Sequence, residues 1–226
     1  MEEEDKVIVL IPSYEPDEKL INLVKKIKYD VIVVNDGSNN TYDNIFKNVK
    51  KYAKVISYDN NMGKGYALKT GFKYIKDNYK NYIIVTMDSD GQHSVNDIDK
   101  LCNYVKKHKD TLVLGKRIRG KNTPIRSYIG NSITRFVYKL VTKNDIYDTQ
   151  TGFRAFSNEL VDFHLNTKGN RFEYEMNILL YGSNKIKMKE IAIETIYIDN
   201  NKSSHFNGLK DSVRIYKQIL KFLFNK

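Results

Sequence analysis

The sequence predicts an α/β fold in which one open sheet is flanked by helices. Three short apolar runs, at residues 7–11, 31–34 and 82–87, are rich in β-branched residues and do not alternate with polar ones. Such runs are typical of strands buried on both faces, as in a parallel sheet. Helical segments separate them, and this order predicts right-handed crossovers. Because open α/β sheets bind ligands at the carboxyl ends of their strands, we expect functional residues directly after these runs.

The first half of the chain supplies two helices between the strands. Apolar residues recur at helical spacing over residues 17–28 and again over residues 66–79, and a weaker strand at residues 55–58 precedes the second helix. The shared apolar faces consist of Leu20, Leu23, Val24 and Ile27 in the first helix, and of Ala67, Gly71, Tyr74 and Ile75 in the second.

The second half continues the alternation, with an irregular stretch around residues 148–154. No repeat, linker or composition shift marks a boundary, and a chain of 226 residues suits one domain with a substantial core. The expected elements are helices over 97–107, 128–142, about 173–181 and 209–224, and strands over 111–115 and 191–198.

Composition restricts the class of protein. Apolar residues make up 41% of the chain and charged residues 29%, as in a soluble globular protein rather than a disordered one. The one cysteine, Cys102, excludes an intramolecular disulfide and a cysteine-rich zinc site. The acidic start MEEED differs from a basic secretory signal, and no apolar run approaches the roughly 20 residues of a spanning helix. These features predict a cytoplasmic location.

The formal charge of +11 is concentrated in one region. Residues 101–143 contain eleven Lys and Arg but one acid, Asp110. A basic region fits nucleic acid, an anionic membrane or a phosphorylated ligand. An excess of lysine that serves only solubility would instead be spread along the chain.

Two turns at the expected ligand edge carry polar residues. The first, PSYEP, follows residues 7–11 and places Tyr14 and Glu15 between two prolines, so it is a rigid turn that can hold a flat heterocycle. The second, NDGS, follows residues 31–34, and its Asp36 can accept a hydrogen bond from a base or a ribose hydroxyl. Taken alone, each is better explained as an ordinary turn.

The acidic turn after residues 82–87 is more specific. Asp88 and Asp90 are two residues apart, beside Gly91 and Gln92. Such oxygen ligands suit Mg²⁺ or Mn²⁺, which usually also bind oxygens of substrate phosphates. Because two carboxylates at a buried strand end repel each other and lose solvation, a cation offsets a real cost. The turn therefore predicts a divalent metal site, and its spacing does not match an EF-hand.

Lys64 lies between Gly63 and Gly65, at the start of a predicted helix. Glycines at a helix N-terminus allow a close approach to an anion, and Lys64 adds positive charge. Neither GxxxxGK[ST] nor GxGxxG occurs in the chain, which argues against a P-loop or dinucleotide-binding protein.

Together these segments resemble family 2 glycosyltransferases of the GT-A fold. The resemblance spans residues 7–222 and rests on PSYEP, VVNDGS, NNMGKGYALKTGF, MDSDGQH and LGKR. The later segments DTQTGFRAF, RFEYEMNILL, ETIYI, SSHF and DSVRIYKQILKF are similar to the bacterial branch of dolichyl-phosphate mannosyltransferase-like enzymes. The resemblance implies a single domain with a Rossmann-like open mixed sheet flanked by helices. It also implies inverting transfer of a sugar from a UDP- or GDP-linked donor to a polyprenyl phosphate.

The resemblance also implies an organisation and roles for individual residues. An acidic tail (1–6) would precede a nucleotide-sugar half (7–100), an acceptor half (101–208) and an amphipathic helix (209–226). Asp88, Asp90 and Arg117 would be catalytic. The donor residues would be Pro12, Tyr14, Glu15, Asp36, Lys64, Asp88 and Ser89, and the ligands of Mg²⁺ or Mn²⁺ would be Asp88, Asp90 and Gln92. The acceptor phosphate would meet Arg117, Arg126, Ser127, Arg135, Arg154 and His205.

This chemistry suits the basic region. A lipid phosphate is already an oxyanion at neutral pH, so the enzyme needs cationic positioning rather than a strong general base. Arg117 directly follows a predicted strand and is the first candidate for that role. His93 and His205 are equally compatible with surface histidines.

Two predicted helices, at residues 128–142 and 209–224, combine an apolar face with several cations. This pattern fits a helix that lies on an anionic membrane, and it also fits a helix packed on the core. We therefore expect an enzyme at the cytoplasmic face of the cell membrane, possible contact with a membrane-embedded partner, and no binding of nucleic acid.

Three alternatives remain open. An enzyme that glycosylates a saccharide or another hydroxyl would need a catalytic carboxylate near the acceptor, for which Asp148 is the one nearby candidate. A nucleic-acid-binding module would use aromatic residues interleaved with the basic run, but the acidic turn would repel a phosphate backbone. An inactive scaffold is disfavoured because Asp88, Asp90 and Gln92 are all present.

Overall fold

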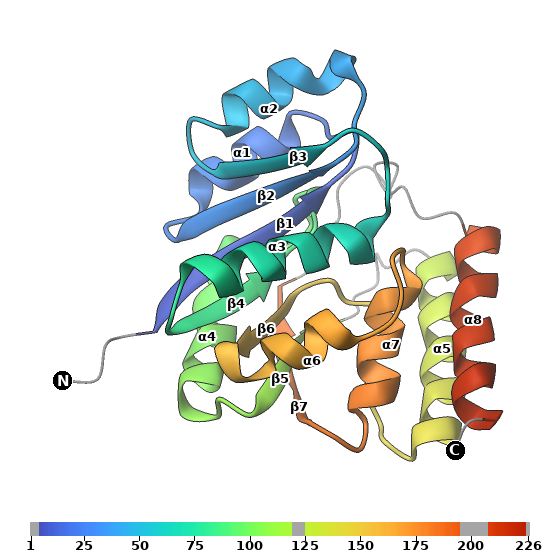
Figure 1. Ribbon diagram of the computed structural model, residues 1–226. Helices are drawn as coiled ribbons and strands as arrows, with labels where there is room; N and C mark the ends of the chain where they lie inside the picture. Colours follow the sequence, from blue (N-terminus) through green and yellow to red (C-terminus); the bar gives the residue numbers. More distant parts are fainter. Residues whose placement is uncertain (1–4, 119–124, 195–207, 225–226) are drawn as a thin grey trace.

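Strand β1 (Lys6–Ser13) lies in the interior of a seven-stranded mixed sheet, in a computed structural model that describes residues 5–118, 125–194 and 208–224. The strand order in this part of the chain is β3-β2-β1-β4-β6-β5-β7 (Figure 1). Every residue of β1 after Lys6 is buried, as expected for a strand covered on both faces. The other strands are β2 (Asp30–Asp36), β3 (Lys54–Tyr58), β4 (Tyr82–Thr86), β5 (Thr111–Arg117), β6 (Arg154–Ser157) and β7 (Lys187–Ile193).

The sheet is mixed because of β6. Strands β1 to β4 pair in parallel, and β5 pairs in parallel with β7. Strand β6 inserts between β4 and β5 and is antiparallel to both. Its amino end therefore lies at the same edge of the sheet as the carboxyl ends of β1, β4 and β5, which brings the preceding loop to the edge where ligands are expected.

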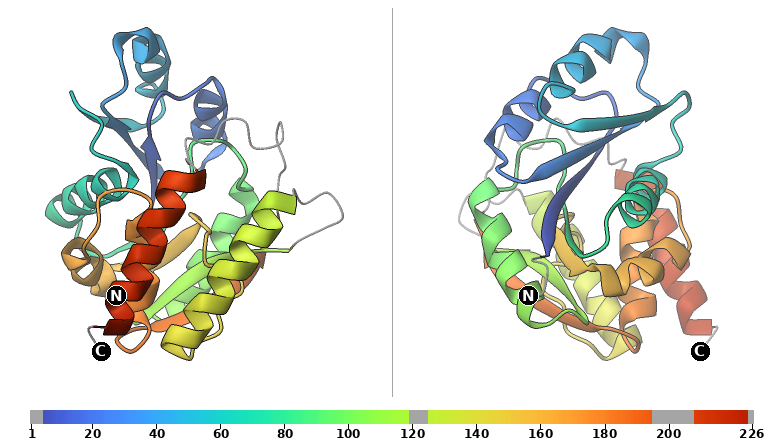
Figure 2. Two further views of the ribbon diagram at one scale, coloured as in Figure 1. Left: turned by 90° about the vertical axis from the view of Figure 1, so that its right-hand side faces the viewer. Right: turned by 60° about the vertical axis from the view of Figure 1, so that its left-hand side comes forward.

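Helices cover both faces of the sheet (Figures 1 and 2). One apolar cluster joins the sheet to α1 (Lys19–Lys26), α2 (Asp43–Val49) and α4 (Ile98–Lys107). The opposite cluster joins it to α3, α5, α6, α7 and α8. These helices are α3 (Lys64–Asn78), α5 (Ile125–Thr142), α6 (Val161–Asn166), α7 (Glu173–Gly182) and α8 (Gly208–Phe224), and three short 3₁₀ turns are η1 (Asn40–Tyr42), η2 (Val95–Asp97) and η3 (Asn158–Leu160).

Helices α5 and α8 run side by side at the end of the molecule farthest from β3 (Figure 1). Each sends some apolar residues inward, among them Tyr138 and Val141 of α5 and Ile215 and Ile219 of α8. Within the described ranges, no helix combines the length and apolarity needed to cross a bilayer.

The mixed open sheet flanked by helices confirms the expected fold class. Two predictions of detail were wrong. Strand β6 was missed because it is four residues long and begins with an arginine, so no apolar run marks it. The strand expected at 191–198 begins earlier, at Lys187, and its expected part after residue 194 lies outside the described residues.

Candidate active site

The acidic turn after β4 meets the loop that leads into β6. The Gly152 carbonyl oxygen accepts a hydrogen bond from the Thr86 hydroxyl at 2.8 Å. A Cβ atom on Gly152 would lie 2.5 Å from Oδ2 and 2.7 Å from Oδ1 of Asp88, closer than real Cβ contacts. The Asp88 carboxylate therefore occupies the space that any larger side chain at position 152 would need.

Lys64 joins the acidic turn to helix α7. Its ammonium nitrogen lies 2.7 Å from Asp88 Oδ1 and 2.8 Å from Glu175 Oε2. The preceding Gly63 has a φ of +100°, and a Cβ atom there would meet the Asn170 carbonyl oxygen at 2.6 Å. A glycine is required for this close approach, which brings the start of α3 against the start of α7.

The Lys64 side chain is 15% exposed and that of Glu175 is 13% exposed. Burial by itself would lower the pKa of Lys64, but the Asp88 and Glu175 carboxylates outweigh it and raise that pKa above its ordinary value. The lysine is therefore a permanent cation between two carboxylates.

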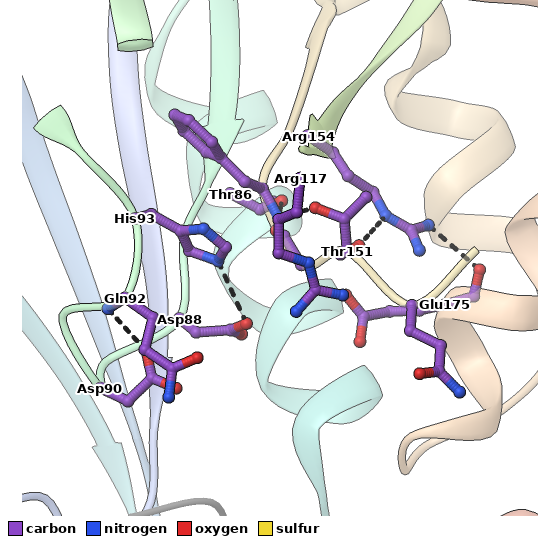
Figure 3. A network of polar contacts seen from close by, with 12 residues as sticks. Thr86, Asp88, Asp90, Gln92, His93, Arg117, Thr151, Arg154 and Glu175 are labelled. Atoms are coloured by element: carbon purple, nitrogen blue, oxygen red, sulfur yellow. Dashed lines mark hydrogen bonds and ion pairs between the residues drawn. The ribbon is translucent and has the colours of Figure 1, made fainter. Parts of the chain in front are cut away.

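His93 approaches Asp88 from another direction (Figure 3). Its Nε2 atom lies 3.4 Å from Asp88 Oδ2, and its ring stacks on Phe153 with centroids 5.0 Å apart. Because His93 is 5% exposed, it is a buried part of the site and not a surface histidine.

The two aspartates of the turn have opposite electrostatic environments. Burial would raise the pKa of Asp88, but Lys64 and His93 outweigh it and hold that pKa well below its usual range. Burial and the neighbouring Asp88 charge raise the pKa of Asp90, whose Oδ1 accepts a hydrogen bond from the Gln92 backbone N–H at 3.0 Å. Asp90 therefore carries the more costly of the two negative charges.

This group of residues has the chemistry that a divalent cation requires. Asp88, Asp90 and Glu175 oppose one cation, Lys64, so the group carries two surplus negative charges. Carboxylate and amide oxygens of Asp88, Asp90 and Gln92 are hard ligands suited to Mg²⁺ or Mn²⁺. In the described ranges no three His, Cys, Asp or Glu residues form a metal cluster. A cation bound at the turn would complete its coordination with water or with oxygens of a ligand.

The expected nucleotide edge is built from the loops after β1 and β2. The Glu15 backbone N–H donates to Ser38 Oγ at 2.8 Å, and Asn39 Nδ2 donates to the Glu15 carboxylate at 3.3 Å. Glu15 has a φ of +46°, which is uncommon for a residue with a side chain and is typical of functional loops. Pro12 is buried, whereas Tyr14 and Ser89 are half-buried, Tyr14 in the β1 loop and Ser89 in the acidic turn.

The buried Asp36 carboxylate binds the segment that precedes Lys64. Its carboxylate accepts hydrogen bonds from the Tyr58 hydroxyl at 2.8 Å, from the Met62 backbone N–H at 2.8 Å and from the Gly63 backbone N–H at 2.9 Å. Asn61 Nδ2 donates to the same carboxylate at 3.1 Å. Asp36 is 3% exposed, so the structure places it as the residue that holds the segment leading to Lys64.

Arg117, at the end of β5, is bound by a buried carboxylate. Its Nε and Nη2 atoms donate to the two oxygens of Asp148 at 2.6 and 2.9 Å. Asp148 is 2% exposed, and its backbone N–H donates to Glu190 on β7. Burial would raise the pKa of Asp148, but the Arg117 guanidinium outweighs it and lowers that pKa. Asp148 is therefore a fixed anion that orients Arg117.

Two other acceptor candidates have described side chains, and both are held by partners within the protein. Arg135 pairs with Asp145 at 2.8 Å and lies over the Tyr147 ring, which Lys116 also faces. Arg154 is 4% exposed and donates to the carbonyl oxygens of Thr151 and Glu175, so it binds backbone rather than a surface ligand (Figure 3). The side chains of Arg126 and Ser127, and all of His205, lie outside the described residues.

Sequence reasoning missed Gly152 and Glu175. Both lie in segments that carry the family resemblance, TGFR and RFEYEMN, so a signal was present. Only the fold brings them within contact of Asp88 and Lys64, which precede them by more than sixty residues.

Comparison with known proteins matches residues 9–166 to the family described as Glycosyl transferase family 2. UDP-N-acetylglucosamine–dolichyl-phosphate N-acetylglucosaminyltransferase of Methanococcus voltae is 31% identical over 86% of this chain and 88% of its own length. Dolichyl-phosphate beta-glucosyltransferase of Saccharomyces cerevisiae is 27% identical over 97% of this chain and 74% of its own. Glucosyl-3-phosphoglycerate synthase from Mycobacterium tuberculosis, crystallised with Mn²⁺ and UDP-glucose, superimposes with a TM-score of 0.72 at 16% identity, covering 98% of this chain and 79% of its own.

Proposed function

Because the chain belongs to glycosyl transferase family 2, we propose that it transfers a sugar, with inversion, from a nucleoside-diphosphate sugar to a polyprenyl phosphate. The donor is UDP- or GDP-linked, and the reaction uses Mg²⁺ or Mn²⁺. Relatives named as dolichyl-phosphate transferases of N-acetylglucosamine and of glucose support the acceptor class and leave the sugar open.

The observation that carries this proposal is the acidic group at the carboxyl edge of β4. Asp88 and Glu175 pair with one lysine, and Asp90 adds a further negative charge beside Asp88. This surplus of negative charge fits a cation that bridges a diphosphate. Asp88, Asp90 and Gln92 would hold the cation, and Lys64 and Ser89 would lie beside the donor. When bound, the cation supplies Lewis-acid stabilisation of the leaving diphosphate.

The nucleotide half would be bound by the β1 and β2 loops. Pro12, Tyr14 and Glu15 would contact the base and ribose, and Asp36 would position the loop before Lys64 through the hydrogen bonds that it accepts. Under this proposal residues 7–100 form the donor half and residues 101–208 the acceptor half.

The acceptor side favours a phosphate over a hydroxyl. Asp148 is the carboxylate that could have served as a base. It is buried, and both of its oxygens accept hydrogen bonds from the Arg117 guanidinium. A hydroxyl acceptor needs a base that removes its proton, whereas a lipid phosphate needs only cations that orient it. Arg117 would orient the phosphate, assisted by Arg126, Ser127, Arg135 and His205. Arg154, which is buried, would support the site from behind.

The exposed faces of α5 and α8 support action at a membrane. On α5 the polar residues Asn131 and Thr134 are 2% and 4% exposed, whereas Phe136 and Leu140 are 63% and 66% exposed. Exposed large apolar residues beside buried polar ones depart from the usual arrangement of a helix on a core, although Tyr138 and Val141 of α5 do pack inward. Exposed apolar area marks an interaction surface. On α8, Leu220 and Phe224 are likewise exposed. Exposed cations accompany them: Lys139, Lys143, Arg214, Lys217 and Lys221.

Apolar side chains surrounded by cations match an anionic bilayer, so we assign these helices to contact with the inner face of the cell membrane. Binding of the purified protein to vesicles of phosphatidylglycerol and phosphatidylcholine would support the bilayer itself as the partner. Binding that requires a membrane-embedded protein would support that protein instead.

The experiment that tests the function is a donor and acceptor screen. The purified protein is incubated with UDP-glucose, UDP-N-acetylglucosamine or GDP-mannose, with Mn²⁺ or Mg²⁺, and with a short polyprenyl phosphate. We expect labelled sugar to enter the organic phase and nucleoside diphosphate to be released for one donor, in a reaction abolished by EDTA. Transfer to a saccharide but not to the lipid phosphate would contradict the proposal.

A further inference from the structure

Glu175 is an acidic residue of the site that the sequence motifs do not single out. It lies on α7, and its carboxylate binds Lys64 at 2.8 Å while the same ammonium binds Asp88 at 2.7 Å. The Lys64 ammonium therefore contacts two carboxylates, that of Asp88 in the acidic turn and that of Glu175 on a helix that covers the sheet.

Glu175 is held through its carboxylate and through its backbone. Its backbone carbonyl oxygen accepts a hydrogen bond from Arg154 Nη1 at 3.0 Å, and Arg154 Nε donates to the Thr151 carbonyl oxygen at 2.9 Å. Thr151 precedes Gly152, the residue that abuts the Asp88 carboxylate. One buried arginine thus ties the helix that carries Glu175 to the loop that confines Asp88, so the spacing between the two carboxylates is fixed by the fold.

The two ion pairs of the Lys64 ammonium have a consequence for cation binding. An ammonium bound by Asp88 alone would neutralise that carboxylate and compete directly with a metal ion for its oxygens. A second carboxylate within hydrogen-bond distance shares the ammonium and adds a negative charge to the site.

We propose that Glu175 is a positioning residue that draws Lys64 partly away from Asp88 and thereby keeps the Asp88 carboxylate available to a divalent cation. This proposal rests on the metal-dependent function proposed above. It makes Glu175 a determinant of cation affinity without making it a metal ligand or a base.

The decisive variants change charge with little change in side-chain volume. Glu175→Gln removes the competing anion and is expected to weaken Mn²⁺ binding about tenfold, because the site loses one negative charge and Lys64 turns fully to Asp88. Lys64→Gln removes the competing cation and is expected to strengthen Mn²⁺ binding to a similar degree while reducing sugar transfer. The double variant is expected to return close to the wild-type affinity, since one charge of each sign is lost.

Binding is measured by electron paramagnetic resonance titration of free Mn²⁺, without donor or acceptor, so that the measurement does not depend on activity. Asp162→Asn is the matched control, because Asp162 pairs with Lys76 on the surface away from the acidic turn, and it should leave Mn²⁺ affinity unchanged. Thermal melting of each variant reports whether the fold is retained.

Each outcome decides the proposal. Wild-type affinity in folded Glu175→Gln, or a double variant as weak as Glu175→Gln alone, overturns the proposal while leaving the metal site in place. If Glu175→Gln does not fold, Lys64→Gln decides alone, and weaker or unchanged Mn²⁺ binding in that variant overturns it. A wild-type protein that binds no Mn²⁺ overturns the metal assignment of the proposed function, and this inference with it.

Discussion

Replacing Gly152 by alanine is a steric test of the site that changes no charge. The added Cβ atom would lie 2.5 Å from Oδ2 and 2.9 Å from Cγ of Asp88, whereas ordinary contacts begin at 3.4 Å. Either the carboxylate or the loop must therefore retreat by about 1 Å. The backbone of Gly152 does not have a positive φ, so the clash with Asp88 is the main consequence of the substitution.

The loop cannot retreat easily, because the Gly152 carbonyl oxygen is bound by Thr86 and the adjacent Thr151 carbonyl oxygen by Arg154. We therefore expect Asp88 to move and its 2.7 Å ion pair with Lys64 to lengthen. Displacement of a reacting group by about 1 Å costs roughly a hundredfold in rate, and overpacking costs about 1–3 kcal/mol in the free energy of unfolding.

The assay is kcat/KM for release of nucleoside diphosphate with Mn²⁺ and polyprenyl phosphate, together with the midpoint of urea unfolding. Gly182→Ala is the control, because its Cβ atom would meet the terminal methyl of Met188 at 2.6 Å, at the flexible end of a side chain on β7. Gly152→Ala with wild-type kcat/KM would refute the idea that Asp88 must occupy its observed position.

Four further predictions follow from the same contacts. Asp90→Ala should lower sugar transfer about a hundredfold or more and abolish Mn²⁺ binding, as measured by titration; full activity would remove Asp90 from the metal site. Arg117→Lys keeps a positive charge opposite Asp148 but loses the paired N–H donors of the guanidinium. The KM for polyprenyl phosphate should therefore rise about tenfold, with the KM for the donor unchanged. A rise in the donor KM would move Arg117 to the donor side. Asp148→Asn should destabilise the protein by about 2 kcal/mol at pH 7, since Arg117 is only partly buried. Because the pKa of Asp148 is lowered in the folded state, this contribution is present above the unfolded pKa of about 4 and is lost as the pH falls through the folded value, so the urea midpoints of the two proteins should converge in acid. Phe136→Gln combined with Leu140→Gln should reduce sedimentation with anionic vesicles while leaving the melting temperature unchanged, because both side chains are exposed; unchanged sedimentation would exclude this face of α5.

The vesicle test uses surface substitutions because α8 also contributes to the core. Ile215 and Ile219 are 8% and 1% exposed, so deletion of the helix would expose apolar surface and confound binding with unfolding. The sequence offered membrane contact and core packing as alternatives for α5 and α8. In the structure each helix packs one face on the core and exposes another that carries apolar residues. Core packing is therefore confirmed for one face, and membrane contact stays a prediction for the other.

The sequence by itself determined most of the helices and strands, and the positions of the acidic turn, the PSYEP turn and Lys64. These depend on local signals: apolar periodicity, prolines, glycines and turn residues. It also located Asp88 and Asp90 at a strand end, where open α/β sheets bind their ligands. It did not reveal β6 or α6, which are short and carry no such signal.

Only the tertiary structure decided the contacts that define the candidate site. The antiparallel insertion of β6 brings Gly152 against Asp88, the packing of α3 on α7 brings Glu175 to Lys64, and the edge of β5 brings Arg117 to Asp148. These partners are separated by between 31 and 111 residues, as their numbers in the sequence show. Local propensity carries no information on such pairs. Their proximity results from the order of strands in the sheet and from the packing of apolar residues elsewhere in the chain.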